Sequence, residues 1–180
     1  NDVDPDAEVA IIGSGLTAMD VLLILRNRNH QAPIHLISPR AALPPRQAPW
    51  QPQDAVDWPE LTSAAAFSRF IRQHLTEDDW HSARWQESFE SLRGGISAAW
   101  QALPAAERQR LLGRFGSWWQ MARYRAGPQT SDAAAAMLTS GQLRLIEGRA
   151  NNIHTAAGRF AIDLGDRVQH ADQVILAIGA

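Results

Sequence analysis

The hydrophobic pattern near the start of the chain predicts a strand, a helix and a second strand. Val9–Ile12 is a continuous apolar run, which is typical of a strand covered on both faces of a parallel sheet. Apolar residues then recur at helical spacing over 16–25, and "IHLIS" (34–38) forms a second short apolar run. Together these segments predict a β-α-β unit with parallel strands.

The middle of the chain has a different pattern. Residues 39–60 are rich in Pro and Gln, which predicts a long irregular segment. Residues 61–126 show helical spacing throughout, with Thr62 or Ser63 as a candidate cap for the first helix. The pair Gly94–Gly95 is expected to break the next helix, and Pro104 to begin another. This region therefore predicts a large helical insertion at 61–126.

The last part of the chain returns to strand-like patterns. A helix ("TSDAAAAMLTSG", 130–141) precedes short apolar or alternating runs separated by Gly, Asn and Asp turns. These runs predict a strand, a small antiparallel meander and a final buried strand at 174–178. The expected fold class is α/β: one domain over 1–180, with a Rossmann-like three-layer parallel sheet, the meander, and the helical insertion after the second strand.

Composition narrows the classes of function. The chain has 180 residues, 45% of them hydrophobic and 20% charged, and a net charge of −2, which gives no reason to expect nucleic acid or an anionic membrane as a partner. It has no cysteine, so disulfides and thiolate metal sites are excluded, and a cytoplasmic location fits. The sequence opens without Met and stops on an apolar strand. We therefore expect a piece of a longer protein.

The turn between the first strand and the helix, "GSGLTA", has the spacing of a dinucleotide site. In such a site Gly13 permits the tight turn, Gly15 lets a pyrophosphate approach the backbone, and Ala18 allows close packing of helix and strand. The pyrophosphate lies on the amides at the helix N-terminus. The predicted cradle consists of Gly13, Ser14, Gly15, Leu16, Thr17 and Ala18. The alternative is a purely structural turn. Asp20 either orients a ribose or the amides of the turn, or is only a polar residue near a helix start.

The end of the second strand bears on the choice of cofactor. NAD sites place an acid there to hold the ribose, whereas the 2′-phosphate of NADP favours Arg. Here Ser38 and Arg40 follow the strand, and no acid occurs until Asp54. The sequence therefore favours NADP(H) over NAD(H), with Arg46 as a weaker second candidate. In the alternative interpretation Arg40 is a solvated loop cation.

The order of these segments resembles a known family. The stretches "IIGSGLTAMDVLLILRNRNHQAPIHLISPRAALP", "LPAAERQRLLGRFGSWWQMARYRAGP", "LTSGQLRLIEGR" and "VILAIGA" are similar to bacterial FAD/NAD(P)-binding proteins described as uncharacterised flavin-dependent oxidoreductases. The turn "GSGLTAMD" also resembles the second, NADPH-binding glycine motif of flavin-dependent monooxygenases. "LAIGA" (176–180) resembles a strand that returns the chain towards the flavin, which adds Gly179 to the expected cofactor contacts.

The resemblance implies a role for the chain within a larger enzyme. It implies an NAD(P)H-binding region that presents nicotinamide for hydride transfer to FAD, with the FAD held by a domain absent from this chain. The substrate is an unknown small molecule, and the isolated chain is not expected to be active. At "SWWQMARYRAGP" the sequence departs from the family, because Gln120, Ala122 and Tyr124 stand where an acid and two histidines are expected. Arg123 and Arg125 remain.

Other candidate chemistry is weak. The six histidines form no pair at helical ligand spacing, so no metal site is expected, and Ser14 is one place too early for a nucleophile elbow. Trp118 and Trp119 are adjacent on a predicted helix, so we expect only one of them to face the local core and the other to meet the missing domain. Two rival functions stay open: a degenerate lid whose own loop and helices fill the nucleotide cleft, and a partner-binding module that uses the Trp-rich helices. We assign no catalytic side chain.

Overall fold

The computed structural model describes residues 3–51, 53–75 and 82–178. The chain divides into two compact units: Asn1–Pro44 with Ala126–Ala180, and Pro45–Arg125. The first unit contains β1 (Val9–Ile12), α1 (Leu16–Asn27), β2 (Ile34–Ser38), α5 (Pro128–Thr139), β3 (Leu143–Glu147), β4 (Asn152–Ala156), β5 (Arg159–Asp163), β6 (Val168–Ala171) and β7 (Gln173–Leu176). The second contains α2 (Ala64–His74), α3 (Ala83–Ala102) and α4 (Ala105–Arg123).

The first unit is built around a parallel sheet with the strand order β3-β2-β1-β7. β1 lies between β2 and β7 and is parallel to both, so Val9 is opposite Ile34 on one side and Gln173 on the other. β3 continues the parallel pairing beyond β2. β4, β5 and β6 form a separate antiparallel meander. The predicted α/β class, the parallel pairing of the first two strands and the meander are confirmed.

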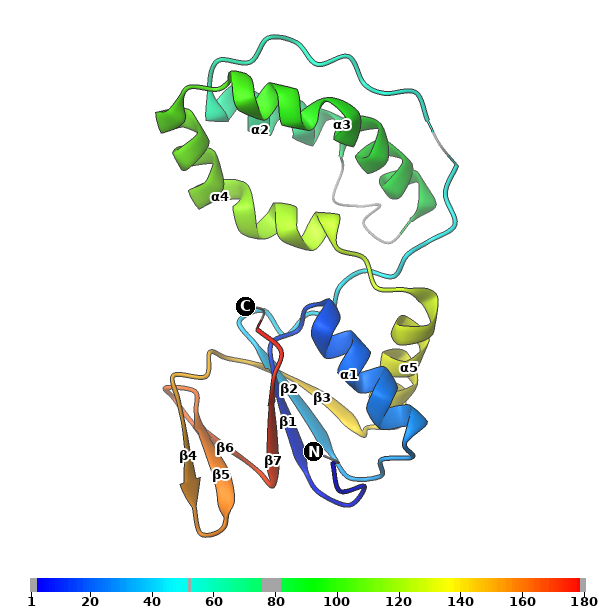
Figure 1. The fold of residues 1–180 in the computed structure, drawn as a ribbon, viewed down its shortest axis with the longest axis vertical. Coiled ribbons are helices and arrows are strands. Elements are labelled where there is room, and N and C mark those ends of the chain that lie inside the picture. Colours follow the sequence, from blue (N-terminus) through cyan, green and yellow to red (C-terminus); the bar gives the residue numbers. More distant parts are fainter. Residues whose placement is uncertain (1–2, 52, 76–81, 179–180) are drawn as a thin grey trace. The chain divides into compact units, whose positions relative to one another are not determined.

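Alternation along β1 divides the core of this unit between two faces. Val9 and Ile11 belong to a buried cluster with residues of α1 and α5, whereas Ala10 and Ile12 belong to one with residues of the meander. Figure 1 shows α1 and α5 on one face of the parallel sheet and β4–β6 on the other. Because both faces are covered at β1 and β2, these two strands read as continuous apolar runs rather than as alternating ones. The prediction of a buried final strand at 174–178 is wrong, because β7 ends at Leu176 and this residue is 62% exposed.

The second unit is a group of three helices around an aromatic core. α2 begins at the N-cap Ser63, whose hydroxyl accepts a hydrogen bond from the Ala66 N–H at 3.2 Å, as one of the two predicted caps. The expected break at Gly94–Gly95 is wrong, because α3 runs through both glycines to Ala102. A Cβ at Gly95 would overlap the Trp58 indole, so this glycine makes room for an aromatic side chain within a continuous helix. The irregular residues 45–51 and 53–60 belong to the same unit.

Candidate functional site

The turn after β1 requires glycine at its first position. Gly13 has a φ of +108°, a conformation that other residues rarely adopt. Its N–H donates to the Ile37 carbonyl of β2 at 2.8 Å, and a Cβ there would overlap the Ala177 carbonyl. The Ala177 N–H in turn donates to the Ile12 carbonyl at 2.8 Å. Gly13 therefore fits closely between the carboxyl ends of the neighbouring strands.

Gly15 differs from Gly13 because nothing in the described chain requires it to be glycine. Its φ of −77° and ψ of −170° are open to any residue. A Cβ built on Gly15 meets no atom within 4 Å, and the residue is exposed. The space in front of this backbone is open.

The N-terminus of α1 follows directly and has no side-chain cap. Gly15 is its N-cap, no described side chain accepts a hydrogen bond from its first amides, and its first turn contains no acidic residue. Ser14 and Leu16 are half-buried and Thr17 is exposed, whereas Ala18 is fully buried in the core between helix and sheet. Unbonded first-turn amides and the positive end of the helix dipole together favour an anion at this position.

The end of β2 lies beside the glycine turn (Gly13–Gly15), as the bond from Gly13 to Ile37 requires. Ser38 is buried, and its Oγ has no hydrogen-bond partner among the described residues. Arg40 is exposed in the turn that follows. Arg40 is therefore accessible to solvent, whereas Ser38 lies below the surface. Gly179, the remaining predicted contact, lies outside the described residues.

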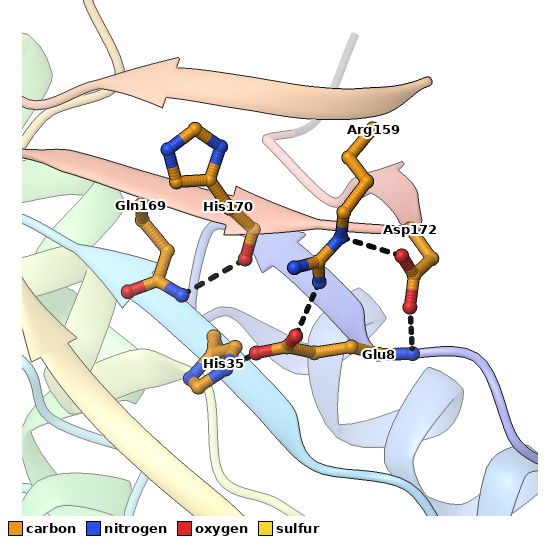
Figure 2. Close-up of polar contacts among 6 residues, drawn as sticks. All are labelled: Glu8, His35, Arg159, Gln169, His170 and Asp172. Carbon is orange, nitrogen blue, oxygen red and sulfur yellow. Dashed lines mark hydrogen bonds and ion pairs between the residues drawn. The ribbon is translucent and has the colours of Figure 1, made fainter. Parts of the chain in front are cut away.

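A polar network that the sequence did not predict lies at the opposite edge of the sheet. It consists of Glu8, His35, Arg159 and Asp172 (Figure 2). His35 Nε2 is 2.5 Å from Glu8 Oε1, Arg159 pairs with the other Glu8 oxygen, and the Arg159 Nε donates to Asp172 Oδ1 at 2.6 Å. The Glu8 N–H closes the network on Asp172 Oδ2 at 2.8 Å. The one signal for this network in the sequence is His35, a titratable side chain in the apolar strand "IHLIS".

The network changes the acidity of its members. Burial by itself would raise the pKa of Glu8, but hydrogen bonds from His35 and Arg159 outweigh it, and the pKa lies below its ordinary value. The pKa of Asp172 is also lowered, mainly by the hydrogen bond from the Glu8 N–H and then by Arg159. Both carboxylates are thus held in their charged form. The network joins the amino ends of β1 and β2 to the meander, which indicates a structural role.

The second unit corrects the expectation for the tryptophan pair. Trp118 and Trp119 of α4 both pack against the same aromatic core, so the prediction that only one of them faces it is wrong. Phe115, one turn earlier, lies 4.5 Å from the Trp118 ring and 6.3 Å from the Trp119 ring by centroids, and contacts both. The two side chains lie on either side of this central residue.

Two arginines of "SWWQMARYRAGP", the segment that differs from the family pattern, contact aromatic rings. The Arg125 guanidinium lies 4.4 Å from the centre of the Trp85 ring, and burial lowers its pKa to about 10. The Arg123 guanidinium lies 5.3 Å from the Tyr124 ring. Arg125 therefore helps to pack the helical unit.

None of the described helices is long and apolar enough to cross a membrane. No group of three or more His, Asp or Glu side chains in the described ranges is arranged to hold a metal ion.

Comparisons with known proteins give low similarity. No protein-family model and no curated protein sequence matches the chain. Among solved structures it is similar to a lysine monooxygenase from Nocardia farcinica (17% identity, TM-score 0.49, 99% of this chain), an ornithine N-hydroxylase from Kutzneria sp. 744 (12%, 0.45, 99%) and an ornithine hydroxylase from Pseudomonas aeruginosa (17%, 0.48, 97%). The chain spans 33%, 37% and 36% of these three chains, respectively.

Proposed function

We propose that this chain is the Rossmann-like, NAD(P)H-binding region of a flavin-dependent oxidoreductase. The pyrophosphate of the cofactor lies on the bare amides of residues 15–18, at the mouth of α1. Arg40 meets the 2′-phosphate of NADP(H). The nicotinamide passes its hydride to FAD, which is bound by a domain outside this chain.

One observation carries this proposal: Gly15 is glycine although neither its backbone angles nor its neighbours require it. Gly13 differs, because both its backbone angle and its close neighbours require glycine there. A pyrophosphate that approaches the backbone supplies the missing reason, because any side chain at Gly15 would stand in its path.

The residues present fit the cofactor chemically. The first-turn amides of α1 donate to phosphate oxygens without a competing side chain, and no described acid in that turn repels them. Arg40 provides a positive charge after β2, where a site for NAD would place a carboxylate. The nicotinamide supplies the hydride, while the chain's own residues bind and orient the cofactor. The single glycine motif is assigned to NAD(P)H, so the binding site for FAD would lie in another part of the parent protein.

Calorimetric titration of the chain with NADPH and NADH tests the proposal. We expect NADPH to bind more tightly than NADH, and Arg40→Ala to weaken NADPH binding about tenfold with little change for NADH. Unchanged NADPH affinity in Arg40→Ala would contradict the assignment of the 2′-phosphate site. If neither nucleotide binds, the proposed function is wrong, and the degenerate lid or partner-binding module takes its place.

A further inference from the structure

A groove with three arginines on its walls runs between α2 and α4 in the helical unit. Arg69 and Arg72 of α2 and Arg114 of α4 line a hollow of about 420 Å³. Leu111 and Phe115 of α4 also line it. We call this hollow the arginine groove. All three arginines are exposed, so their guanidinium groups are accessible from solvent.

None of these three arginines has a salt bridge or hydrogen-bond partner among the described residues. Arg110, one turn before Arg114 on α4, is paired with Glu107. The second oxygen of Glu107 accepts a hydrogen bond from the Ala64 N–H at 2.9 Å. Among the described residues, Glu107 is paired with Arg110 and no carboxylate is paired with the three arginines of the groove.

The bottom of the groove is apolar. Leu111 is 2% exposed and Phe115 8%, and Ala64 at the start of α2 is 7% exposed. An apolar floor strengthens the interaction of nearby charges with a bound anion, because it displaces water from one side of the contact. It also offers a surface on which the hydrocarbon part of a ligand can rest.

We infer that the arginine groove binds a small amphipathic acid, with its carboxylate or phosphate held by Arg69, Arg72 and Arg114 and its apolar body lying on Leu111 and Phe115. Planar guanidinium groups suit both acids, since each presents a fork of donors to two oxygens. Such a ligand relieves the repulsion among three like charges and covers the apolar floor. This site is independent of the nucleotide site proposed for the other unit.

Calorimetry on the full 180-residue chain tests the inference with four probes: octyl phosphate, octanoate, inorganic phosphate and octanol, all below their aggregation limits. We expect saturable binding of octyl phosphate or octanoate, and inorganic phosphate to bind at least about tenfold more weakly than octyl phosphate because it lacks the apolar body. Octanol, which lacks the charge, should show no saturable binding. A response to octyl phosphate alone identifies the acid as a phosphate, and a response to both identifies a general anion site.

Variants locate the binding. Arg69→Gln, Arg72→Gln and Arg114→Gln should each weaken binding about fivefold or more, since each removes one charge-assisted contact. Arg108→Gln, on α4 but outside the groove, is the matched control and should change affinity less than twofold, roughly. Urea unfolding of every variant checks that the fold is intact. The inference is overturned if no amphipathic acid binds, if octanol binds equally well, or if the three groove variants behave like the control.

Discussion

The two edges of the parallel sheet treat their polar groups in opposite ways. At the amino-terminal edge, Glu8, His35, Arg159 and Asp172 bond to one another and to a backbone N–H. At the carboxyl-terminal edge, the glycine turn (Gly13–Gly15) leads into a helix whose first amides no described side chain caps. At one edge the charged side chains pair with one another, and at the other the first amides of α1 have no side-chain acceptor among the described residues.

This difference separates a structural role from a binding role. A closed network of charges holds the meander to the sheet, and an external ligand has little to gain from it. Bare amides at a helix N-terminus are favourable for an anion and have little other use to the chain. The contrast also assigns the two glycines, since Gly13 serves packing between strands and Gly15 leaves room in front of the helix.

Replacement of Gly13 should have the largest effect on stability. In Gly13→Ala the new Cβ overlaps the Ala177 carbonyl, and the φ of +108° is unfavourable for alanine. We expect a loss of about 3 kcal/mol in the free energy of unfolding, measured by urea denaturation. Gly15→Ala is the matched control and should cost about 1 kcal/mol or less, since its Cβ points into open space. Equal losses in both variants would remove the distinction between the two glycines.

Breaking the network at His35 should have an intermediate effect. His35→Leu keeps the buried volume roughly constant but leaves Glu8 Oε1 without its partner, so we expect a loss of about 2 kcal/mol in the free energy of unfolding. His170→Leu is the control, because that ring is exposed and makes no contact with the network in Figure 2. NADPH affinity should be unchanged in both. A coupled loss of NADPH binding in His35→Leu, with the fold intact, would contradict the separation of the two edges.

The pH dependence should give the smallest effect. The pKa values of Glu8 and Asp172 are lowered from 4.5 and 3.8, so their contribution is complete above these values and is lost as the pH falls through the lower values of the folded state. Unfolding midpoints in urea should therefore decrease as the pH falls below about 4.

Asp172→Asn tests the source of this acid sensitivity. It should weaken the dependence on pH, because one of the two titrating carboxylates is gone while Glu8 remains. Asp166→Asn, in an exposed turn, serves as the control and should keep the wild-type profile. An unchanged profile in Asp172→Asn would show that the acid sensitivity arises elsewhere in the chain.

The local signals in the sequence were sufficient for β1, β2 and the glycine turn. A short apolar run and a glycine at a strand end each act over a few residues, so the local sequence pattern is enough to predict the strand and the turn. The structure agrees on β1 and β2 at the predicted bounds. The same signals identified the meander, where turn residues separate short alternating runs.

The features that sequence analysis missed depend on contacts between distant segments. Gly95 lies within α3, and the Trp58 indole, from a segment far away in sequence, occupies the space beside it. The network joins Glu8 to Arg159 and Asp172, more than 150 positions along the chain, and no local pattern reports such a pairing. The error at Trp118 and Trp119 had a geometric cause. Side chains about 100° apart on a helix can still contact one core when a residue such as Phe115 lies between them.

The most direct test of the central claim is Gly15→Asp, assayed for both stability and NADPH binding. Aspartate is a favourable N-cap, so the free energy of unfolding should stay the same or rise by up to about 1 kcal/mol. Its carboxylate would accept hydrogen bonds from the first amides of α1 and repel the pyrophosphate, so NADPH affinity should fall by at least about tenfold. A Gly15→Asp chain that is equally stable and binds NADPH as tightly as the wild type would contradict the account.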